Sequence, residues 1–452
     1  MSLGRLLQQD WQDKAMHRRV WAMAAPMILS NLTVPLVTLT DTAVVGRLPH
    51  AYQLGAVVLA STLYVAMIGS LGFLRMGTTG FAAQAAGRND ADALHRILWQ
   101  GLLLGAGLAA LLIALSIPAT NALLGLIDPT PELRHDAQQF FQTRLLGLPA
   151  ALASYALIGW FLGNQNARMP LLMLVVTGLS NIALVLTFVL HWQWGIKGAA
   201  LASVIAEWLG FIVGLSVALR QLKSIGGKLH WPSFILWRNW KPLLSVNRDI
   251  FLRSLALQSV FLFFASQGAR MGDDIIAANA ILLNGLMLTA YALDGLAQAT
   301  EALCGHAIGA RSREQLRRAL VITGGWSFLV SVAFLLGFSA TGSYFIDLQT
   351  SLVDVRNTAL RYLPYLAVLP VIAVWSYLLD GLFIGATRAR EMRDAMLLAL
   401  LLSAPITALL LPLGNDGLWL SFISFLLLRG LLMAWFAWRI KQRQQWLETD
   451  AR

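Results

Sequence analysis

Long apolar stretches recur along the chain and are separated by short polar breaks. Each stretch holds enough residues to cross the roughly 30 Å hydrocarbon core of a bilayer as a helix, which takes about 20 residues. The stretches are continuous instead of alternating, so they predict helices and not barrel strands, because lipid offers no water to an open backbone. We expect twelve transmembrane helices, at 20–44, 54–86, 94–117, 137–163, 168–190, 198–220, 250–268, 275–305, 316–340, 357–385, 391–412 and 417–438.

The composition agrees with an all-α integral membrane protein. Apolar residues make up 57% of the chain and charged residues 13%, whereas soluble domains have about 45–50% and 25%. A chain this poor in charge cannot cover a water-facing surface, which excludes a soluble enzyme, a disordered protein and a disulfide scaffold. The single cysteine, Cys304, cannot form an internal disulfide.

The distribution of positive charge predicts the topology. Of the 34 lysines and arginines, 25 fall in the termini and every second loop, and only 6 fall in the alternate loops. By the positive-inside rule both termini are expected in the cytoplasm of a bacterial cell, with the chain in its inner membrane. The net charge of +11 is therefore a topology signal. No folded basic face is present that would indicate a nucleic-acid partner.

The longest polar interruption, 221–247, separates two halves of the chain. It is basic and carries Trp231, Trp237 and Trp240, which suits a segment lying on the inner headgroups. The simpler alternative is a tether between the halves. We therefore expect an N-lobe at 1–220, a cytoplasmic linker at 221–247, and a C-lobe with a cytoplasmic tail at 248–452.

The two halves resemble each other in sequence. GRNDADALHR at 87–96 returns as GARSREQLRR at 309–318, and GWFLG at 159–163 returns as GLFIG at 381–385, both at an offset of 222. An offset that spans six helices preserves orientation, so it predicts two parallel six-helix repeats. Transporters built this way bind substrate at the repeat interface, here expected as a central cavity, and alternate access by rocking the halves. A carrier is favoured over a channel.

Five acids fall within the expected spans, where a charge is costly and usually functional. They are Asp41, Glu207, Asp294, Glu301 and Asp380. Asp41 shares the first span with Pro26 and Pro35, which can each kink the helix. Desolvation favours the neutral form of a carboxyl, so Asp41 is a candidate proton carrier near physiological pH. The alternative is that Asp41 lies near the outer end and reaches water, since Arg47 follows closely.

The three acids of the C-terminal half suggest a second site. Asp294 and Glu301, seven residues apart, share one helix face, and together with Asp380 they can hold a cation, a proton or a cationic substrate. The alternative is a set of structural ion pairs with Arg75, Arg144 or Arg253.

The remaining polar groups indicate no chemistry of their own. Glu207 is read as structural. His306 and Cys304 lack companion ligands, so no metal site is expected. No nucleophile–base pair indicates an enzyme.

Several longer motifs resemble the multidrug and toxic compound extrusion (MATE) family, most closely its DNA-damage-inducible F branch. They are PLVTLTDTAVVG at 35–46, LRMGTTG at 74–80, YALDG at 291–295 and YLLDGLFIGAT at 377–387. The resemblance covers nearly the whole chain. It implies a secondary exporter of amphipathic, often cationic compounds, driven by H⁺ or Na⁺, with no other cofactor and as a monomer.

The resemblance also implies an N-lobe coupling site around Asp41. Asn181 matches the family's fifth-helix asparagine and Ser203 a sixth-helix hydroxyl, but Val185 stands where the family has a second acid. Losing that acid removes a natural Na⁺ ligand, which favours protons at Asp41. Protonation is expected to change hydrogen bonding to Asn181 and Thr42 and to bend the first helix near Pro26. The alternatives are a Na⁺-coupled exporter using Asp294, Glu301 and Asp380, and a flippase for lipid-linked precursors.

Overall fold

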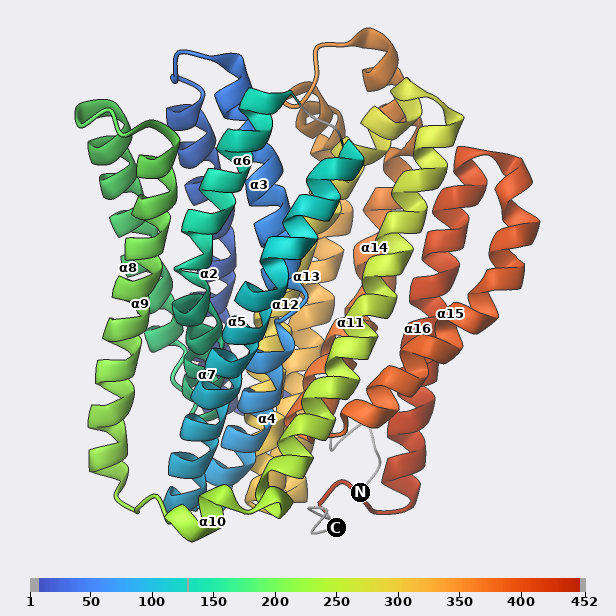
Figure 1. Cartoon of the computed structure of the whole chain (residues 1–452). Coiled ribbons are helices and arrows are strands. Elements are labelled where there is room, and N and C mark those ends of the chain that lie inside the picture. Colours follow the sequence, from blue (N-terminus) through green and yellow to red (C-terminus); the bar gives the residue numbers. More distant parts are fainter. Residues whose placement is uncertain (1–7, 128–129, 448–452) are drawn as a thin grey trace. The chain divides into compact units, whose positions relative to one another are not determined.

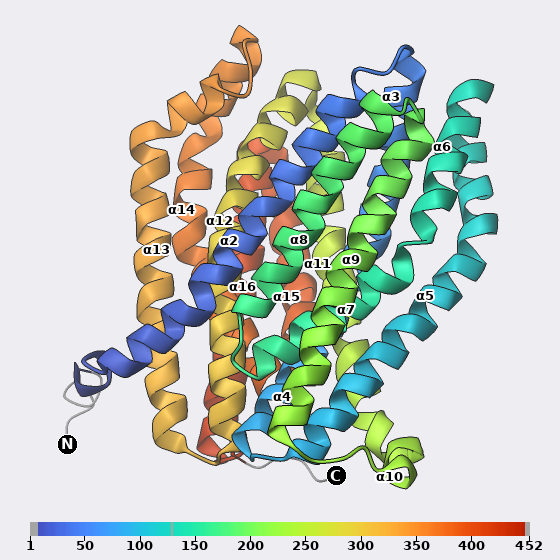
Figure 2. The ribbon, with the colours of Figure 1, turned by 90° about the vertical axis from the view of Figure 1, so that its left-hand side faces the viewer.

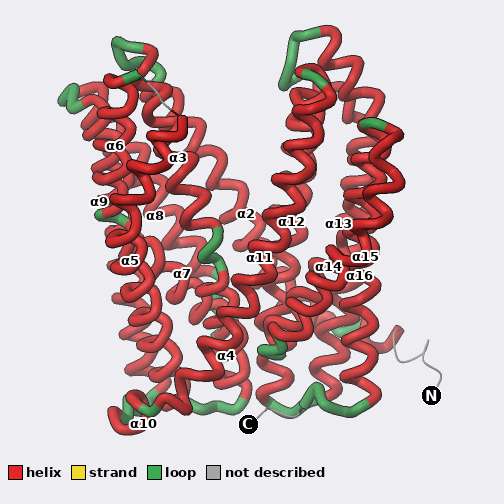
Figure 3. The backbone as a smooth tube through the Cα atoms, turned by 45° about the vertical axis from the view of Figure 1, so that its right-hand side comes forward, coloured by secondary structure: helices red, strands yellow, loops and turns green. Residues whose placement is uncertain are grey.

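The structure is a computed structural model that describes residues 8–127 and 130–447. Within helices, the side chains of residues 34–39, 42, 117, 119 and 121–127 lie outside this description. Helices and loops account for all of the described residues, with no strand among them (Figure 3).

The helices follow one another with short connections (Figure 1). The first half holds α2 (Lys14–Val45), α3 (Ala51–Gly69), α4 (Phe73–Gly87), α5 (Ala91–Ile127), α6 (Pro131–Leu145), α7 (Leu148–Gly163), α8 (Arg168–Val185), the π-helix η1 (Leu186–His191), α9 (Gly195–Ile225) and α10 (Trp231–Ile235). The second half holds α11 (Trp237–Met271), α12 (Asp273–Gly309), α13 (Arg313–Asp347), α14 (Val353–Gly385), α15 (Ala389–Leu410), the 3₁₀-helix η2 (Leu411–Leu413) and α16 (Asn415–Gln442).

The helices confirm an all-α, multi-pass membrane protein. Among the described residues, ten segments are long and apolar enough to cross a membrane, and the bent pair α6 and α7, at 46°, makes an eleventh. The expected span 54–86 is α3 and α4 with a break between them, and 137–163 is the α6–α7 pair. The remaining expected span, 20–44, coincides with α2, which contains the side chains that are not described.

The chain divides into two compact units. One, here called the N-unit, comprises residues 29–243, and the other, the C-unit, comprises residues up to 28 together with those from 244 onward. Both borders fall inside a helix, α2 and α11. In each case a proline, Pro26 or Pro242, precedes the border by two residues or fewer.

The sequence repeat is also a repeat of turns. Asn89 and Arg311, in the two matching loops, have positive φ angles of 54° and 52°. Gln165 and Thr387 follow the two glycine motifs and have φ of 57° and 55°. In all four turns the next residue donates its backbone N–H to a carbonyl five residues earlier, which ends the helix in a left-handed cap. The two halves therefore share their helix ends as well as their sequence motifs.

The paired glycine motifs bring the same helices together in each unit. GWFLG lies on α7 and packs against α4, while GLFIG lies on α14 and packs against α12 (Figures 1 and 2). A Cβ on Gly163 would lie 2.7 Å from the backbone nitrogen of Ala83, and one on Gly381 would lie 2.5 Å from the carbonyl oxygen of Ala297. Only glycine permits backbones to approach this closely.

The residues just before α2 and its first turn are fastened to α13 within the C-unit. Asp10 is 1% exposed and accepts a hydrogen bond from the Arg317 guanidinium at 2.6 Å. Arg318 pairs with Asp13 at 3.1 Å. Further along, the indole of Trp326 donates to His17 at 2.9 Å. The amino-terminal turns of α2 are thus held by both ion pairs and aromatic contacts.

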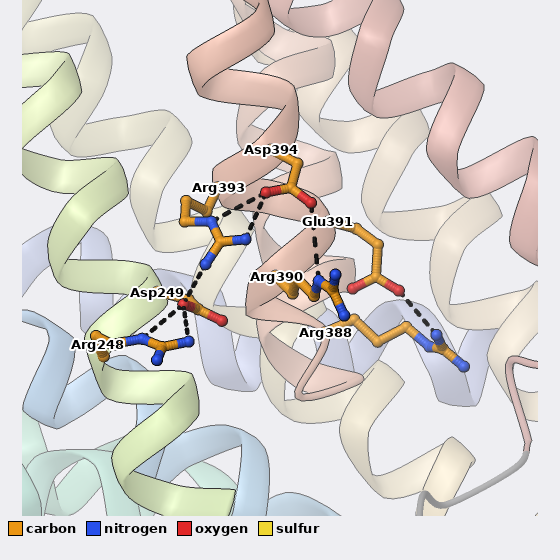
Figure 4. A network of polar contacts seen from close by, with 7 residues as sticks. All are labelled: Arg248, Asp249, Arg388, Arg390, Glu391, Arg393 and Asp394. Carbon is orange, nitrogen blue, oxygen red and sulfur yellow. Dashed lines mark hydrogen bonds and ion pairs between the residues drawn. The ribbon is translucent and has the colours of Figure 1, made fainter.

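A network of arginines and acids joins α11 to α15 in the C-unit (Figure 4). Its centre is Asp249, 3% exposed, which accepts hydrogen bonds from Arg393 at 2.7 Å and from Arg248 at 3.0 Å. Arg393 also contacts Asp394 at 2.6 Å. The network lies in the first half of α11 and the first two turns of α15, and it fixes these two helices to each other.

The segment between α9 and α11 is shorter than the expected linker, because α9 continues to Ile225 and α11 begins at Trp237. Asp92, at the start of α5, accepts a hydrogen bond from the backbone nitrogen of Lys228 at 2.8 Å and pairs with His230 at 3.3 Å. Trp237 is 67% exposed.

Candidate functional site

A cavity of about 620 Å³ opens among α3, α6, α8, α9 and the part of α2 that belongs to the N-unit. Three of the residues predicted from the sequence, Asp41, Asn181 and Ser203, line it together. Its walls are otherwise a mixture of apolar and polar side chains. They are Thr33, Leu54, Val57, Val58, Ser61, Thr62, Tyr64, Val65, Ala66, Phe140, Arg144, Leu174, Thr177, Gly178 and Glu207.

Asp41 lines this cavity, and its carboxyl forms no hydrogen bond or ion pair with a described residue. Its Oδ1 atom is buried and forms no hydrogen bond with any described residue. An unmade hydrogen bond on a buried polar atom is costly, at about 1–3 kcal/mol. A proton, a water or a ligand bound at Asp41 would therefore supply the hydrogen-bond partner that its Oδ1 atom lacks.

Asn181 and Ser203 form a polar pair across α8 and α9. The Asn181 amide donates to the Ser203 hydroxyl oxygen at 2.9 Å. The Asn181 Oδ1 atom is buried and accepts no hydrogen bond from the described part of the chain. One turn further along α8, Val185 is fully buried and apolar. The cavity therefore gains no second carboxylate from α8.

A buried ion pair supplies the second carboxylate from another helix. Arg144 on α6 contacts Glu207 on α9 at 2.8 Å, with side chains 13% and 16% exposed. The Tyr64 hydroxyl reaches Glu207 at 3.4 Å. The Arg144 guanidinium carbon also lies 4.1 Å from the centroid of the Tyr64 ring, a cation–π distance.

The acids that line the cavity outnumber its arginines by one. Arg144 is engaged by Glu207, and it interacts electrostatically with Asp41 as well, without a direct hydrogen bond to it in the described structure. The sequence analysis did not identify Tyr64 or Arg144 as cavity residues. A balance of charges within each half would have indicated the pair, because Arg144 and Glu207 both fall inside spans of the first half.

The prolines and Thr42 lie on the same helix as Asp41. Pro26 is half-buried in the part of α2 that belongs to the C-unit. The side chains of Pro35 and Thr42 lie outside the described residues, although their backbone continues α2.

The acids of the second half are distributed differently. Asp380 on α14 forms ion pairs with Arg253 on α11, at 2.9 Å, and with Arg429 on α16. Asp294 accepts a hydrogen bond from Gln298 at 2.6 Å. Glu301, 2% exposed, lies two turns further along α12. Asp380 is thus the counter-ion of two buried guanidiniums.

This arrangement defines a class of protein: a membrane transporter made of two repeated helical halves, with ionisable groups buried inside them. The MatE family model matches residues 26–187 and 250–413, one match in each half. The chain belongs to this family of MATE transporters.

Individual relatives agree with this assignment. The chain is 45% identical to DNA damage-inducible protein F of Escherichia coli K12 over 93% of its own length and 91% of that protein. It is 26% identical to a probable multidrug resistance protein NorM of Xanthomonas axonopodis pv. citri, over 92% of each chain. A crystal structure of MATE in the bent conformation superimposes with a TM-score of 0.87 at 19% identity, covering 98% of this chain and 99% of that one. This last likeness concerns the fold.

Proposed function

We propose that this multidrug efflux transporter exports amphipathic, often cationic compounds in exchange for H⁺, and that Asp41 carries the proton. The observation that supports the proposal most directly is the buried Oδ1 atom of Asp41, which has no hydrogen-bond partner among the described residues, in a cavity where Arg144 is already engaged by Glu207. The name of the Xanthomonas relative, a probable multidrug resistance protein, agrees with drug export.

The ion pair explains how Asp41 stays available. An arginine without another partner would form a permanent ion pair with Asp41. In a cavity without charged neighbours, Asp41 would interact only with bulk water. Glu207 and Tyr64 hold the guanidinium of Arg144 instead. The cavity then carries one net negative charge when Asp41 is ionised, and none when Asp41 is protonated.

This change of charge couples the two ligands. A cationic compound binds best to the ionised cavity, and proton uptake removes the charge that attracts it. The two ligands therefore favour different states of one site, which is the condition for exchange. We propose that the protonated carboxyl donates to the free Oδ1 of Asn181 and that α2 bends near Pro26.

The oxygen ligands available in the cavity favour H⁺ over Na⁺ as the coupling ion. A proton needs one carboxylate oxygen, whereas a metal cation needs several oxygen ligands, and Val185 removes the family's second acid from α8. In the C-unit, Asp380 already balances Arg253 and Arg429. We propose that the chain works as a monomer, in the inner membrane of a bacterial cell with both termini in the cytoplasm, as the charge distribution predicts.

Transport in proteoliposomes tests the proposal. A cationic dye should be exchanged when a pH gradient is imposed at constant Na⁺, and Asp41→Asn should abolish this exchange. Glu132→Gln, an exposed acid at the start of α6, is the matched control and should transport normally. Exchange that continues in Asp41→Asn, or that follows a Na⁺ gradient at fixed pH, would contradict proton coupling at this residue.

A further inference from the structure

The C-unit contains a groove of about 1010 Å³. It is distinct from the Asp41 cavity and from the Asp380 cluster, none of whose residues line it. The helix α14 lies between α13 and α16 and contacts both (Figure 2). The lining residues are Arg313, Glu314, Leu316, Arg317, Leu320, Ile372, Trp375, Leu378, Leu379, Leu382, Leu427, Gly430, Leu431, Ala434, Ala437, Trp438, Lys441, Gln444, Trp446 and Leu447.

The wall of this groove is apolar and long. The groove follows α16 from Leu427 to Lys441, which spans about 21 Å at 1.5 Å per residue. This exceeds one leaflet of a hydrocarbon core about 30 Å thick. Leu431 is 59% exposed and Trp375 is 47% exposed. Large apolar side chains that are open along a leaflet's depth suit an acyl chain.

One end of the groove is positively charged. Arg313 donates to the neutral amide oxygen of Gln444 at 3.0 Å. The ammonium of Lys441 forms no hydrogen bond or ion pair with the residues that the structure describes. The other two charged lining residues are compensated, because Arg317 pairs with Asp10 and Glu314 pairs with Arg318. Among the described residues, Arg313 and Lys441 are therefore two positive charges without an acid.

The charged end lies where a headgroup would be. Arg313 begins α13 and Lys441 is in the last turn of α16, and both belong to the side that the positive-inside rule places in the cytoplasm. Trp438, 57% exposed, lies one turn before Lys441, as tryptophans do at a membrane interface. Basic pockets between transmembrane helices on this side suit anionic lipid headgroups.

We infer that this groove is a binding site for one anionic phospholipid, with its phosphate between Arg313 and Lys441 and an acyl chain along α14 and α16. The two uncompensated charges oppose a cationic amphiphile and give a zwitterionic lipid less attraction than an anionic one. The inference does not depend on proton coupling at Asp41.

Native mass spectrometry of the purified full-length protein in detergent tests this. Phosphatidylglycerol and phosphatidylcholine with identical acyl chains are titrated in parallel, and one phosphatidylglycerol should bind at least tenfold more tightly. The double variant Arg313→Gln/Lys441→Gln should lose this preference. Arg439→Gln is the matched control, because Arg439 lies two residues before Lys441, stacks on Trp435 and does not line the groove.

Two further experiments distinguish a lipid-binding site from a phosphate-binding site. Ala434→Trp fills the apolar wall and should weaken phosphatidylglycerol binding, whereas Leu401→Trp, at a 70% exposed position on α15, should not. Excess inorganic phosphate should fail to displace the bound lipid. Equal affinity for both lipids, equal loss in the control variants, or displacement by phosphate would each overturn the inference.

Discussion

Asp41 in the N-unit and Asp380 in the C-unit are both acids buried within transmembrane helices, and their surroundings are opposite. Asp41 lies beside an arginine that another acid already holds. Asp380 is shared by two arginines of its own. We propose that Asp41 can exchange a proton because Glu207 already holds the one arginine beside it, whereas two direct arginine partners fix Asp380 as a counter-ion. On this proposal, the two repeats of one fold differ in how many arginines contact the buried acid.

The largest effect on stability is expected from Asp380→Asn, which removes the one carboxylate that directly contacts both buried guanidiniums. Breaking a buried ion pair costs about 3–5 kcal/mol, so the loss here should reach at least the upper end of that range. Chemical unfolding of the protein in detergent measures it. Asp294→Asn is the control, because Asp294 accepts from the neutral Gln298 and should cost less. Equal losses in both variants would remove the proposed distinction.

A smaller loss is expected from Arg144→Leu, which leaves Glu207 buried with only the Tyr64 hydroxyl. The cost should be about 3 kcal/mol in the same unfolding measurement. The double variant Arg144→Leu/Glu207→Leu removes both charges and should recover most of the stability. If the double variant is as unstable as the single one, the pair contributes through packing and not through charge.

The smallest effect on stability is expected from Asp41→Asn. Because the Asp41 carboxyl has no fixed partner, its loss should change the free energy of unfolding by less than about 0.5 kcal/mol. Transport should nevertheless be lost. A large destabilisation would show that Asp41 is held as firmly as Asp380, and the contrast between the two units would disappear.

Much of this fold is predictable from the sequence, because hydrophobic length and the repeat depend on local patterns. The matching turns at Asn89 and Arg311 follow from the repeated loop sequence. The bend between α6 and α7 is partly local, because Pro149 lies at the start of α7. The close approach of Gly147 to the Glu207 carboxylate is not, because it depends on how α9 packs against this bend.

The candidate site was predictable where a family motif exists. Asp41, Asn181 and Ser203 were named from such motifs and line one cavity. The pairing of Arg144 with Glu207 depends on how α6 and α9 are rotated about their axes, which no single-helix pattern specifies. For the same reason, the sequence left open which arginine would pair with Asp380.

The helix α2 is a single continuous rod that belongs to both units. Asp10 clamps one end to α13, and Asp41 lies close to the other. Pro26 lacks a backbone N–H donor, so it weakens α2 between the part in the C-unit and the part in the N-unit. A change of shape near Asp41 can therefore bend the helix at this position. We propose that a change in the protonation of Asp41 alters the shape of α2 near Pro26, within this one helix.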